Sequence, residues 1–203
     1  MAGWTRHEGQ AVALPFANID TDQLIPARFM SVPRSEGYGD YLLYDLRRDD
    51  DGALQPDFPL NRHQGASVVI AGRNFGSGSS REAAVYALVD AGIRAVIAPS
   101  FGDIFSSNAV NNGLLPARVD PQEVERLSAL LGDGVAQAAI DLEEGTVTLS
   151  GVKLDFALDE SWRIKLINGW DDIDLTQQHA AAISRFKETR SQTASWAWPA
   201  AAD

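Results

Sequence analysis

The sequence predicts a mixed α/β domain, and three stretches of the chain support that prediction. Two apolar strand-like runs, Ser67–Ala71 and Arg94–Ala98, flank a helix-like segment from Ala83 to Ala91. A strand–helix–strand unit of this kind is almost always parallel and right-handed. The segment from Ala138 to Leu158 alternates in polarity, as half-buried strands do. Residues 121–131 are amphipathic with the period of a helix.

The length and composition fit one globular domain with a short appendage. The chain has 203 residues, of which 45% are hydrophobic and 22% are charged, and this is enough for one substantial core. We expect a single domain over residues 1–190 and a C-terminal tail over residues 191–203. The tail holds Trp196 and Trp198, so it either docks on another surface or ends as a partly ordered segment.

The charge and the cysteine content exclude several classes of function. The formal net charge of −11 argues against a nucleic-acid surface, which carries a basic face, and against an anionic membrane as a partner. An anionic substrate is still allowed, because a pocket responds to its local groups. The absence of cysteine excludes disulfides, thiolate catalysis and cysteine-ligated clusters within this chain. No apolar signal region or membrane-length run is present, so a cytoplasmic location is the expectation.

The N-terminal third of the chain mixes short elements with turns. Gly9–Phe16 is apolar enough for a strand, whereas Pro33, Gly37 and Gly39 make residues 31–39 a loop with freedom to move. We also expect a polar turn at Asn18–Asp22 with a short exit at Gln23–Pro26, a short helix at Tyr41–Leu46, a charged turn at Asp49–Gly52, and an extended connection at Leu54–Gly65 that contains two prolines.

The remainder of the chain is more regular. The helix after Ala83 ends at Gly92, which suits a C-cap. The other expected elements are a helix from about Asp103 to Asn111 stopped by Asn112-Gly113, a helix at Pro121–Leu131 with Gly132 past its end, strands that turn at Glu143–Gly145, and helices at Asp159–Ile167 and Leu175–Arg185.

The candidate site is the stretch from Gly72 to Glu82, G-R-N-F-G-S-G-S-S-R-E. It places three glycines, three serines and two arginines in a strand-to-helix turn. Such a turn presents free backbone N–H groups and the positive end of a helix to an anion. Arg81 adds a planar fork suited to a carboxylate or phosphate, and the hydroxyls of Ser79 and Ser80 would lie in the same pocket. The turn therefore predicts a site for a small anionic molecule.

Generic motifs do not account for this turn. It lacks the lysine and the spacing of a P-loop, and no serine is centred in a nucleophile elbow. Arg81 occupies the place of the third glycine in a dinucleotide fingerprint. The histidines, His7, His63 and His179, are scattered without metal-binding spacing, so no metal site is expected in this chain.

A purely structural alternative is a helix cap. Ser79 or Ser80 could cap the following helix, with Glu82 completing an arrangement like a capping box. Arg81 argues against this alternative, because a cation at a helix N-terminus is unfavourable unless an anion compensates for it.

Three ordered blocks of the chain resemble a known family. They are N-I-D-T-D-Q-L-I-P-A-R-F (Asn18–Phe29), N-F-G-S-G-S-S-R-E (Asn74–Glu82) and A-P-S-F-G-D-I-F-S-S-N-A-V-N-N-G-L-L-P (Ala98–Pro116). They resemble the small subunits of 3-isopropylmalate dehydratase, which are similar to the swivelling C-terminal domain of aconitase. The match covers nearly the whole chain. It implies a swivelling β/β/α domain with a β-barrel-like core flanked by helices.

The resemblance also implies a reaction and a partner. In this family the large subunit carries a 4Fe–4S cluster whose open iron binds the substrate, and the small subunit closes over it. The reaction interconverts 2-isopropylmalate and 3-isopropylmalate by dehydration and rehydration through isopropylmaleate, in leucine biosynthesis. The chain would then be a hydro-lyase subunit that holds no cofactor itself, acts on a small dicarboxylate, and is active only with its large subunit.

Particular residues acquire roles through the matched blocks. Ser79 is the implied base that removes the carbon-bound proton, and Asp22 matches an acidic active-site residue. Ser80 and Arg81 would bind a substrate carboxylate. Arg28 lies near the position of another carboxylate-binding arginine, although the spacing differs from that of aconitase.

The segment after the first block is a candidate for substrate specificity. In the family, the corresponding loop approaches the variable group of the substrate. Phe29, Met30 and Val32 are apolar and suit an isopropyl group better than a third carboxylate. The alternative is that these side chains serve ordinary packing or the mobility of a lid.

Two departures from the family pattern keep other functions open. Typical small subunits have G-C-G-S-S-R-E-H-A, whereas this chain has Ser77 for the cysteine and Ala83 for the histidine. The missing histidine allows a related hydro-lyase subunit that acts on another 2-hydroxy diacid, of the citraconate or dimethylmalate type. A third hypothesis, from another class, is a non-catalytic anion-binding regulatory module that kept the turn and lost the chemistry.

Overall fold

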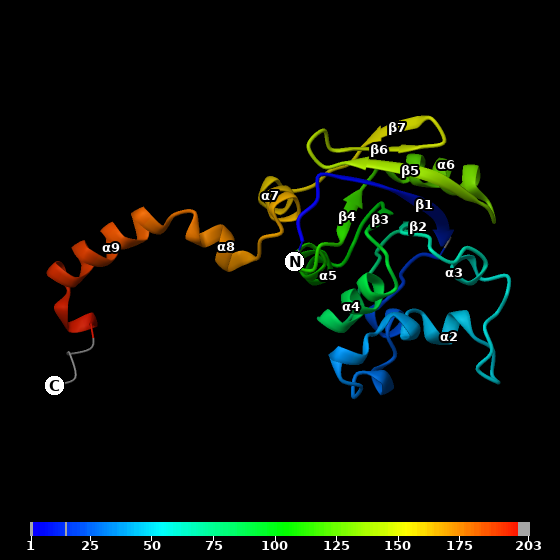
Figure 1. Ribbon diagram of the computed structural model, residues 1–203, viewed down its shortest axis with the longest axis horizontal. Helices are drawn as coiled ribbons and strands as arrows, with labels where there is room; N and C mark the ends of the chain where they lie inside the picture. The colour runs from blue at the N-terminus through cyan, green and yellow to red at the C-terminus, as the bar shows by residue number, and fades with distance from the viewer. Residues whose placement is uncertain (1, 15, 199–203) are drawn as a thin grey trace.

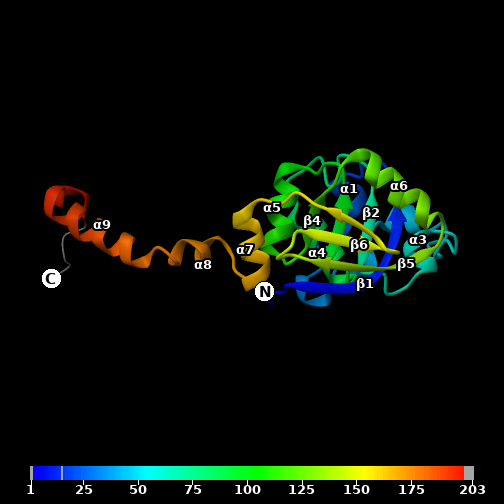
Figure 2. The ribbon, with the colours of Figure 1, turned by 90° about the horizontal axis from the view of Figure 1, so that it is seen from above.

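A mixed seven-stranded sheet forms the centre of the molecule (Figure 1). The computed structural model describes residues 2–14 and 16–198. The strand order is β4-β3-β2-β1-β5-β6-β7, and the sheet curls so that the later strands close over one side, which agrees with the predicted barrel-like core (Figure 2). The strands are β1 (Arg6–Leu14), β2 (Val68–Ala71), β3 (Ala95–Ala98), β4 (Leu115–Arg118), β5 (Val135–Asp141), β6 (Thr146–Leu149) and β7 (Val152–Asp155).

One half of the sheet is parallel and the other half is antiparallel. Strands β1 to β4 pair in parallel, and the register places Ala11 beside Val68 and Val68 beside Ala95. Strands β1, β5, β6 and β7 pair in antiparallel fashion. The predicted parallel unit β2–α4–β3 is therefore confirmed, as is the turn at Glu143–Gly145, which joins β5 to β6.

Both faces of the parallel half are buried. Val12 and Leu14 belong to one apolar core, whereas Ala11 and Ala13 belong to another on the opposite face. Helices α4 and α5 contribute to the first core, and α6 and α7 contribute to the second. Strands covered on both faces appear in a sequence as continuous apolar runs, as in residues 68–71.

The helices match the predictions best where the sequence carries clear end signals. Helix α6 has the predicted bounds, with Asp120 as its N-cap, and α4 ends before Gly92, which has φ of +88°. The α-helices are α1 (Thr21–Leu24), α2 (Tyr44–Arg47), α3 (Pro59–Arg62), α4 (Glu82–Asp90), α5 (Asp103–Asn111), α6 (Pro121–Leu131), α7 (Glu160–Asn168), α8 (Asp172–Gln177) and α9 (Ala180–Thr193), with 3₁₀ helices at Ala27–Phe29, Arg34–Glu36, Gly39–Tyr41 and Ser195–Ala197.

Several sequence-based predictions of elements need correction. The predicted polar turn at Asn18–Asp22 and the exit at Gln23–Pro26 contain the short helix α1, which Asp20 caps. Strand β4 is absent from the predicted elements, and Pro116 disfavours strands, but β4 is the edge of the sheet, where a proline is tolerated. The connection at residues 54–65 contains α3, which Pro59 begins. The predicted helix at residues 41–46 starts later, as α2, because Leu43 has φ of +50°. The predicted single helix at residues 175–185 is two helices, α8 and α9.

The predicted loop at residues 31–39 is tied to the end of α4. Arg34 forms an ion pair with Asp90, and the Tyr38 backbone N–H donates to the same carboxylate at 2.7 Å. The Tyr38 ring is buried, and its hydroxyl donates to the Val32 carbonyl at 2.8 Å. These contacts attach the loop to the body of the domain.

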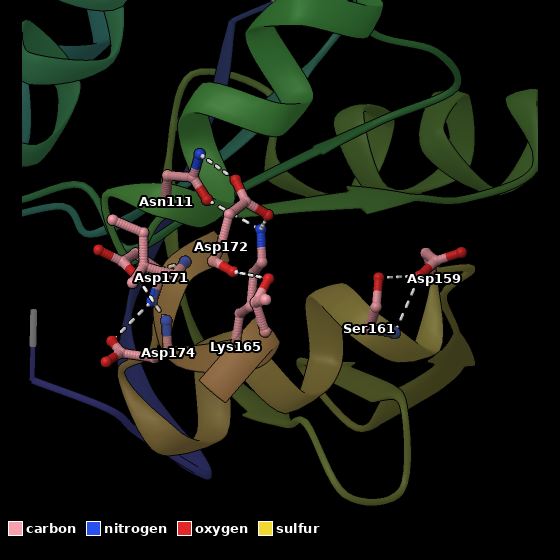
Figure 3. Close-up of polar contacts among 9 residues, drawn as sticks. Asn111, Asp159, Ser161, Lys165, Asp171, Asp172 and Asp174 are labelled. Atoms are coloured by element: carbon pink, nitrogen blue, oxygen red, sulfur yellow. Dashed lines mark hydrogen bonds and ion pairs between the residues drawn. The ribbon is translucent and has the colours of Figure 1, made fainter. Parts of the chain in front are cut away.

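A buried lysine joins the body to the C-terminal helices (Figure 3). Lys165 of α7 is only 3% exposed, forms an ion pair with Asp172 of α8, and donates to Asn111 Oδ1 of α5 at 3.1 Å. The hydrogen bond from Lys165 lowers the pKa of the Asp172 carboxyl. Beyond this junction α8 and α9 extend away from the sheet (Figures 1 and 2).

The C-terminal helices expose several apolar side chains. Ile173, Phe186, Trp196 and Trp198 are all exposed, and the Trp196 ring faces the Arg190 guanidinium at 5.9 Å. Residues 199–203 of the predicted tail lie outside the described residues. Within the part of the chain that the structure describes, no helix has the length and apolar character to cross a bilayer.

Candidate active site

The glycine-serine turn lies at the carboxyl ends of the parallel strands. It follows β2 and lies between two other segments, one after β1 and one after β3. Ser77 of the turn forms a β-bridge with Asp20, in the segment after β1, and Phe75 forms one with Phe101, in the segment after β3. The Gly76 N–H donates to the Ile19 carbonyl at 2.7 Å, and this bond holds the turn close to the segment after β1. In open α/β sheets, ligands bind outside this same edge.

Two glycines make this close assembly sterically feasible. Gly76 has φ of +70°, and a Cβ atom placed on it would lie 2.2 Å from the Phe105 ring. Gly78 has φ of +96°, a backbone conformation that L residues with side chains rarely adopt. The turn therefore needs glycine at both positions, for a close approach at Gly76 and for chain reversal at Gly78.

The backbone of Ser79 is held on both sides of its α-carbon. Its N–H donates to Thr21 Oγ1 at 3.1 Å, and the Thr21 hydroxyl donates back to the Ser79 carbonyl at 3.0 Å. The Arg81 N–H donates to the same carbonyl at 2.8 Å. The side chain of Ser79 is exposed, as is that of Ser80, and no hydrogen bond within the described residues uses either hydroxyl.

The helix-cap alternative for these serines is wrong. Helix α4 begins at Glu82, its N-cap residue is Arg81, and no side chain of the described residues caps it. Ser79 and Ser80 therefore precede the cap position and leave their hydroxyls uncommitted. Glu82 instead accepts a hydrogen bond from Asn112 Nδ2 at 2.9 Å, at the end of α5.

Arg81 and Asp22 meet beside the serines. They form an ion pair in which the Arg81 side chain is 24% exposed and the Asp22 side chain is 57% exposed. Asp22 is the second residue of α1, and Asp20 and Gln23 cap the start of that helix reciprocally. The structure thus brings together four predicted site residues, namely Asp22, Ser79, Ser80 and Arg81.

Arg28 lies apart from this group in its contacts. Both of its terminal nitrogens bond to the carboxylate of Asp45, one of them at 3.0 Å, and its guanidinium faces the Phe29 ring at 4.6 Å. The hydrogen bonds between them lower the pKa of Asp45 and raise that of Arg28. Within the described residues, none of the contacts of Arg28 is with the turn.

The predicted specificity residues differ in what they contact. Phe29 stacks on Tyr41 with ring centroids 4.3 Å apart, and both Phe29 and Val32 pack against the first core. Met30 is 40% exposed and is the most available of the three side chains to another molecule.

Sequence reasoning missed two groups at this site. The first is Thr21, an uncharged residue between the two aspartates of D-T-D. Its hydroxyl was the available signal, because threonine side chains in turns often hydrogen-bond to backbone groups. The second is the hydrogen bond from Asn112 to Glu82, which joins residues far apart in the chain, so no local sequence pattern predicts it.

The comparisons with known proteins agree with this architecture. A family model described as the aconitase C-terminal domain matches residues 1–122. The 3-isopropylmalate dehydratase small subunit of Shouchella clausii is 46% identical over 187 residues, covering 91% of this chain and 95% of that protein. The protein of the same name from Shewanella oneidensis is 47% identical over 202 residues, covering 97% of this chain and 99% of its own length.

A solved structure is similar as well. The crystal structure of 3-isopropylmalate dehydratase from Methanocaldococcus jannaschii superposes with a TM-score of 0.64 at 26% identity. The similarity covers 89% of this chain and 99% of that one.

Proposed function

The chain belongs to the aconitase C-terminal domain family, and within it to the 3-isopropylmalate dehydratase small subunits, and on that premise we propose how its residues serve the reaction. Paired with a large subunit, it takes part in the interconversion of 2-isopropylmalate and 3-isopropylmalate through isopropylmaleate, in leucine biosynthesis. Ser79 acts as the base, Ser80 and Arg81 bind a substrate carboxylate, and Asp22 orients Arg81.

The observation that carries this proposal is the group of uncommitted serine hydroxyls beside the Arg81–Asp22 ion pair. A serine hydroxyl is a poor base unless its alkoxide is stabilised, and the helix start and the Arg81 guanidinium can supply that stabilisation. The proton next to a carboxylate is weakly acidic, so the charge that accumulates on that carboxylate must be held. Arg81 offers a bidentate fork for this purpose.

The large subunit completes the site. The chain contains no cysteine, so it cannot provide thiolates for an iron–sulfur cluster, and none of the described residues forms a cluster of metal ligands. The 4Fe–4S cluster of the family belongs to the large subunit and supplies the Lewis acid for loss of hydroxide. The exposed side chains of Ser79 and Ser80 are open to a surface that closes over them.

Arg28 and Met30 have secondary roles in this proposal. Arg28 binds a second carboxylate by exchanging Asp45 for substrate, since both partners of that pair are more than half exposed. Met30 contributes an apolar surface for the isopropyl group, since it is exposed in the segment that follows Arg28. We place the complex in the cytoplasm, where such biosynthetic enzymes work.

The test is an anaerobic assay with the cluster-bearing large subunit, in which hydration of isopropylmaleate and of citraconate is followed in parallel. Turnover that requires both chains and prefers isopropylmaleate supports the proposal. A preference for citraconate would keep the mechanism and change the substrate, as the buried Ala83 in place of the family histidine allows. A stable complex without turnover would point to the regulatory module.

A further inference from the structure

We propose that Thr21 is a positioning residue for Ser79, and that its hydroxyl, rather than its packing, sets the direction of the Ser79 side chain. The inference rests on the proposed role of Ser79 as the base. It adds a residue to the machinery that does not itself touch the substrate.

The first reason is the way in which the Thr21 hydroxyl is used. Its oxygen accepts from the Ser79 N–H at 3.1 Å while its proton goes to the Ser79 carbonyl at 3.0 Å. One hydroxyl therefore bonds both backbone groups of a single residue. Because these two groups flank the α-carbon, fixing them fixes the direction of the Cα–Cβ bond, and only the χ1 rotation of Ser79 is left.

The second reason is burial. Thr21 is 1% exposed, so its hydroxyl has no water to replace these partners. The β-branched side chain is stiff at χ1, which holds the hydroxyl in place. The Thr21 N–H also donates to the Ser77 carbonyl at 2.9 Å, so backbone and side chain of Thr21 act on the same turn.

The third reason is the neighbouring pair. Asp22, the next residue in α1, holds the side chain of Arg81. The first turn of α1 therefore orients both the proposed base and the proposed carboxylate ligand. The capping box between Asp20 and Gln23, with bonds of 2.8 and 3.0 Å, fixes that turn.

A consequence concerns the stabilisation of the Ser79 alkoxide. Because the Ser79 N–H is engaged by Thr21, it is not available as a donor to an oxyanion. The donors must come from the start of α4 and from Arg81. Loss of the Thr21 hydroxyl should therefore misdirect Ser79 without removing those donors, and a misplacement of about 1 Å can cost about 10²-fold in rate.

The experiment compares Thr21→Val, which keeps the shape and removes the hydroxyl, with Thr21→Ser, which keeps the hydroxyl. In complex with the large subunit, Thr21→Val should lower kcat about 10²-fold with little change in KM, and Thr21→Ser should restore most of the rate. The matched control is Thr146→Val, at another buried threonine, in β6. It should leave kcat unchanged.

A second measurement does not depend on activity. By NMR on the isolated chain, the Ser79 amide should exchange with solvent at least about tenfold faster in Thr21→Val, while the amides of β2 keep their protection. An unchanged kcat, an unchanged Ser79 exchange rate, or an equal loss in Thr21→Ser would each overturn the inference. Failure of the base assignment itself would appear separately, as full turnover in Ser79→Ala with the exchange result intact.

Discussion

Asp22 and Arg81 form an ion pair across 59 positions of the chain, beside the exposed hydroxyls of Ser79 and Ser80. Arg81 is the N-cap residue of α4, where a cation is otherwise unfavourable. The Asp22 carboxylate compensates for that charge in the free subunit. A guanidinium has five N–H donors, so Arg81 can keep this partner and still offer a fork edge to a substrate carboxylate.

Replacing Ser79 by Ala should remove the base and leave the fold intact, because the side chain is exposed and makes no hydrogen bond within the described residues. We expect kcat to fall by about 10²–10⁴-fold. Thermal unfolding and gel filtration with the large subunit should match the wild type. Turnover within a few-fold of wild type would exclude Ser79 as the base.

The substitution Arg81→Lys should be far from conservative. Lysine keeps the charge but loses the planar fork that can hold Asp22 and a carboxylate together. We expect kcat/KM to fall by about 10–100-fold, in line with the loss of a charge-assisted hydrogen bond. The control is Arg126→Lys, which changes an exposed arginine paired within α6 and should have no effect on kcat/KM.

Gly76→Ala should destabilise the protein more than Gly65→Ala does. Both glycines have positive φ, at +70° and +89°, so both substitutions carry a similar backbone cost of about 1–2 kcal/mol. A Cβ atom at Gly76 would meet the Phe105 ring at 2.2 Å, whereas one at Gly65 would meet nothing within 4 Å. Overpacking should add about 1–3 kcal/mol at Gly76. Equal urea midpoints for the two variants would contradict the close approach of Gly76 to the Phe105 ring.

The Lys165–Asp172 pair should respond asymmetrically to mutation. Among the described residues, Asp172→Ala leaves the buried ammonium with only Asn111 as its partner, whereas Lys165→Met removes the charge itself. Because the Asp172 side chain is 70% exposed and partly screened, we expect Asp172→Ala to cost about 1–2 kcal/mol. Lys165→Met should cost less. Chemical denaturation of both variants measures the difference, and the reverse order would refute it.

His7 should make the stability of the protein depend on pH. Burial, aided by the nearby Arg94 cation, lowers the pKa of His7 below its ordinary value of 6.5, and its Nε2 lies 2.8 Å from Ser67 Oγ. The unfolded chain therefore binds this proton more readily. The contribution of His7 to the free energy of unfolding is therefore complete above pH 6.5, the pKa of His7 in the unfolded chain. It is lost as the pH falls from 6.5 through the lower pKa of the folded protein.

The measurement for His7 is urea unfolding at about pH 7.5 and about pH 5, for the wild type and for His7→Gln. Because acidification also changes the stability through groups other than His7, the informative quantity is the difference between the two proteins. The variant should lose less stability on acidification. Parallel pH profiles would show that His7 does not contribute.

The sequence predicts the fold best where local chemistry determines structure. Pro121 and Gly132 bound α6, and the strand-like apolar run after Ser67 is the buried strand β2, as predicted. Elements whose existence depends on their position in the tertiary fold are not predicted from local sequence. Strand β4 contains Pro116 and exists because it forms the edge of the sheet. The break between α8 and α9 at Gln178-His179 has no glycine or proline to mark it.

The candidate site also combines features that the local sequence predicts with features that only the tertiary structure shows. The turn itself is visible in the sequence as glycines and serines before a helix, and Arg81 is the residue from which the sequence predicts an anion site there. The partners of that turn lie in segments far from it in the chain, so the structure is needed to show that Thr21 engages Ser79. The pairing of Arg28 with Asp45 likewise appears only in the structure. Which carboxylate an arginine pairs with depends on the tertiary fold.

The parallel pairing of β1 with β2 has a consequence for how the molecule becomes functional. The register that sets Ala11 beside Val68 also brings Asp20 to Ser77 and Asp22 to Arg81. The hairpins β5–β6 and β6–β7 close short loops, whereas this pairing closes a long one before it gains any contact. We therefore expect the geometry of the candidate site to form only once this long-range pairing is made, so a change that impedes the closure should delay function even where every site residue is intact.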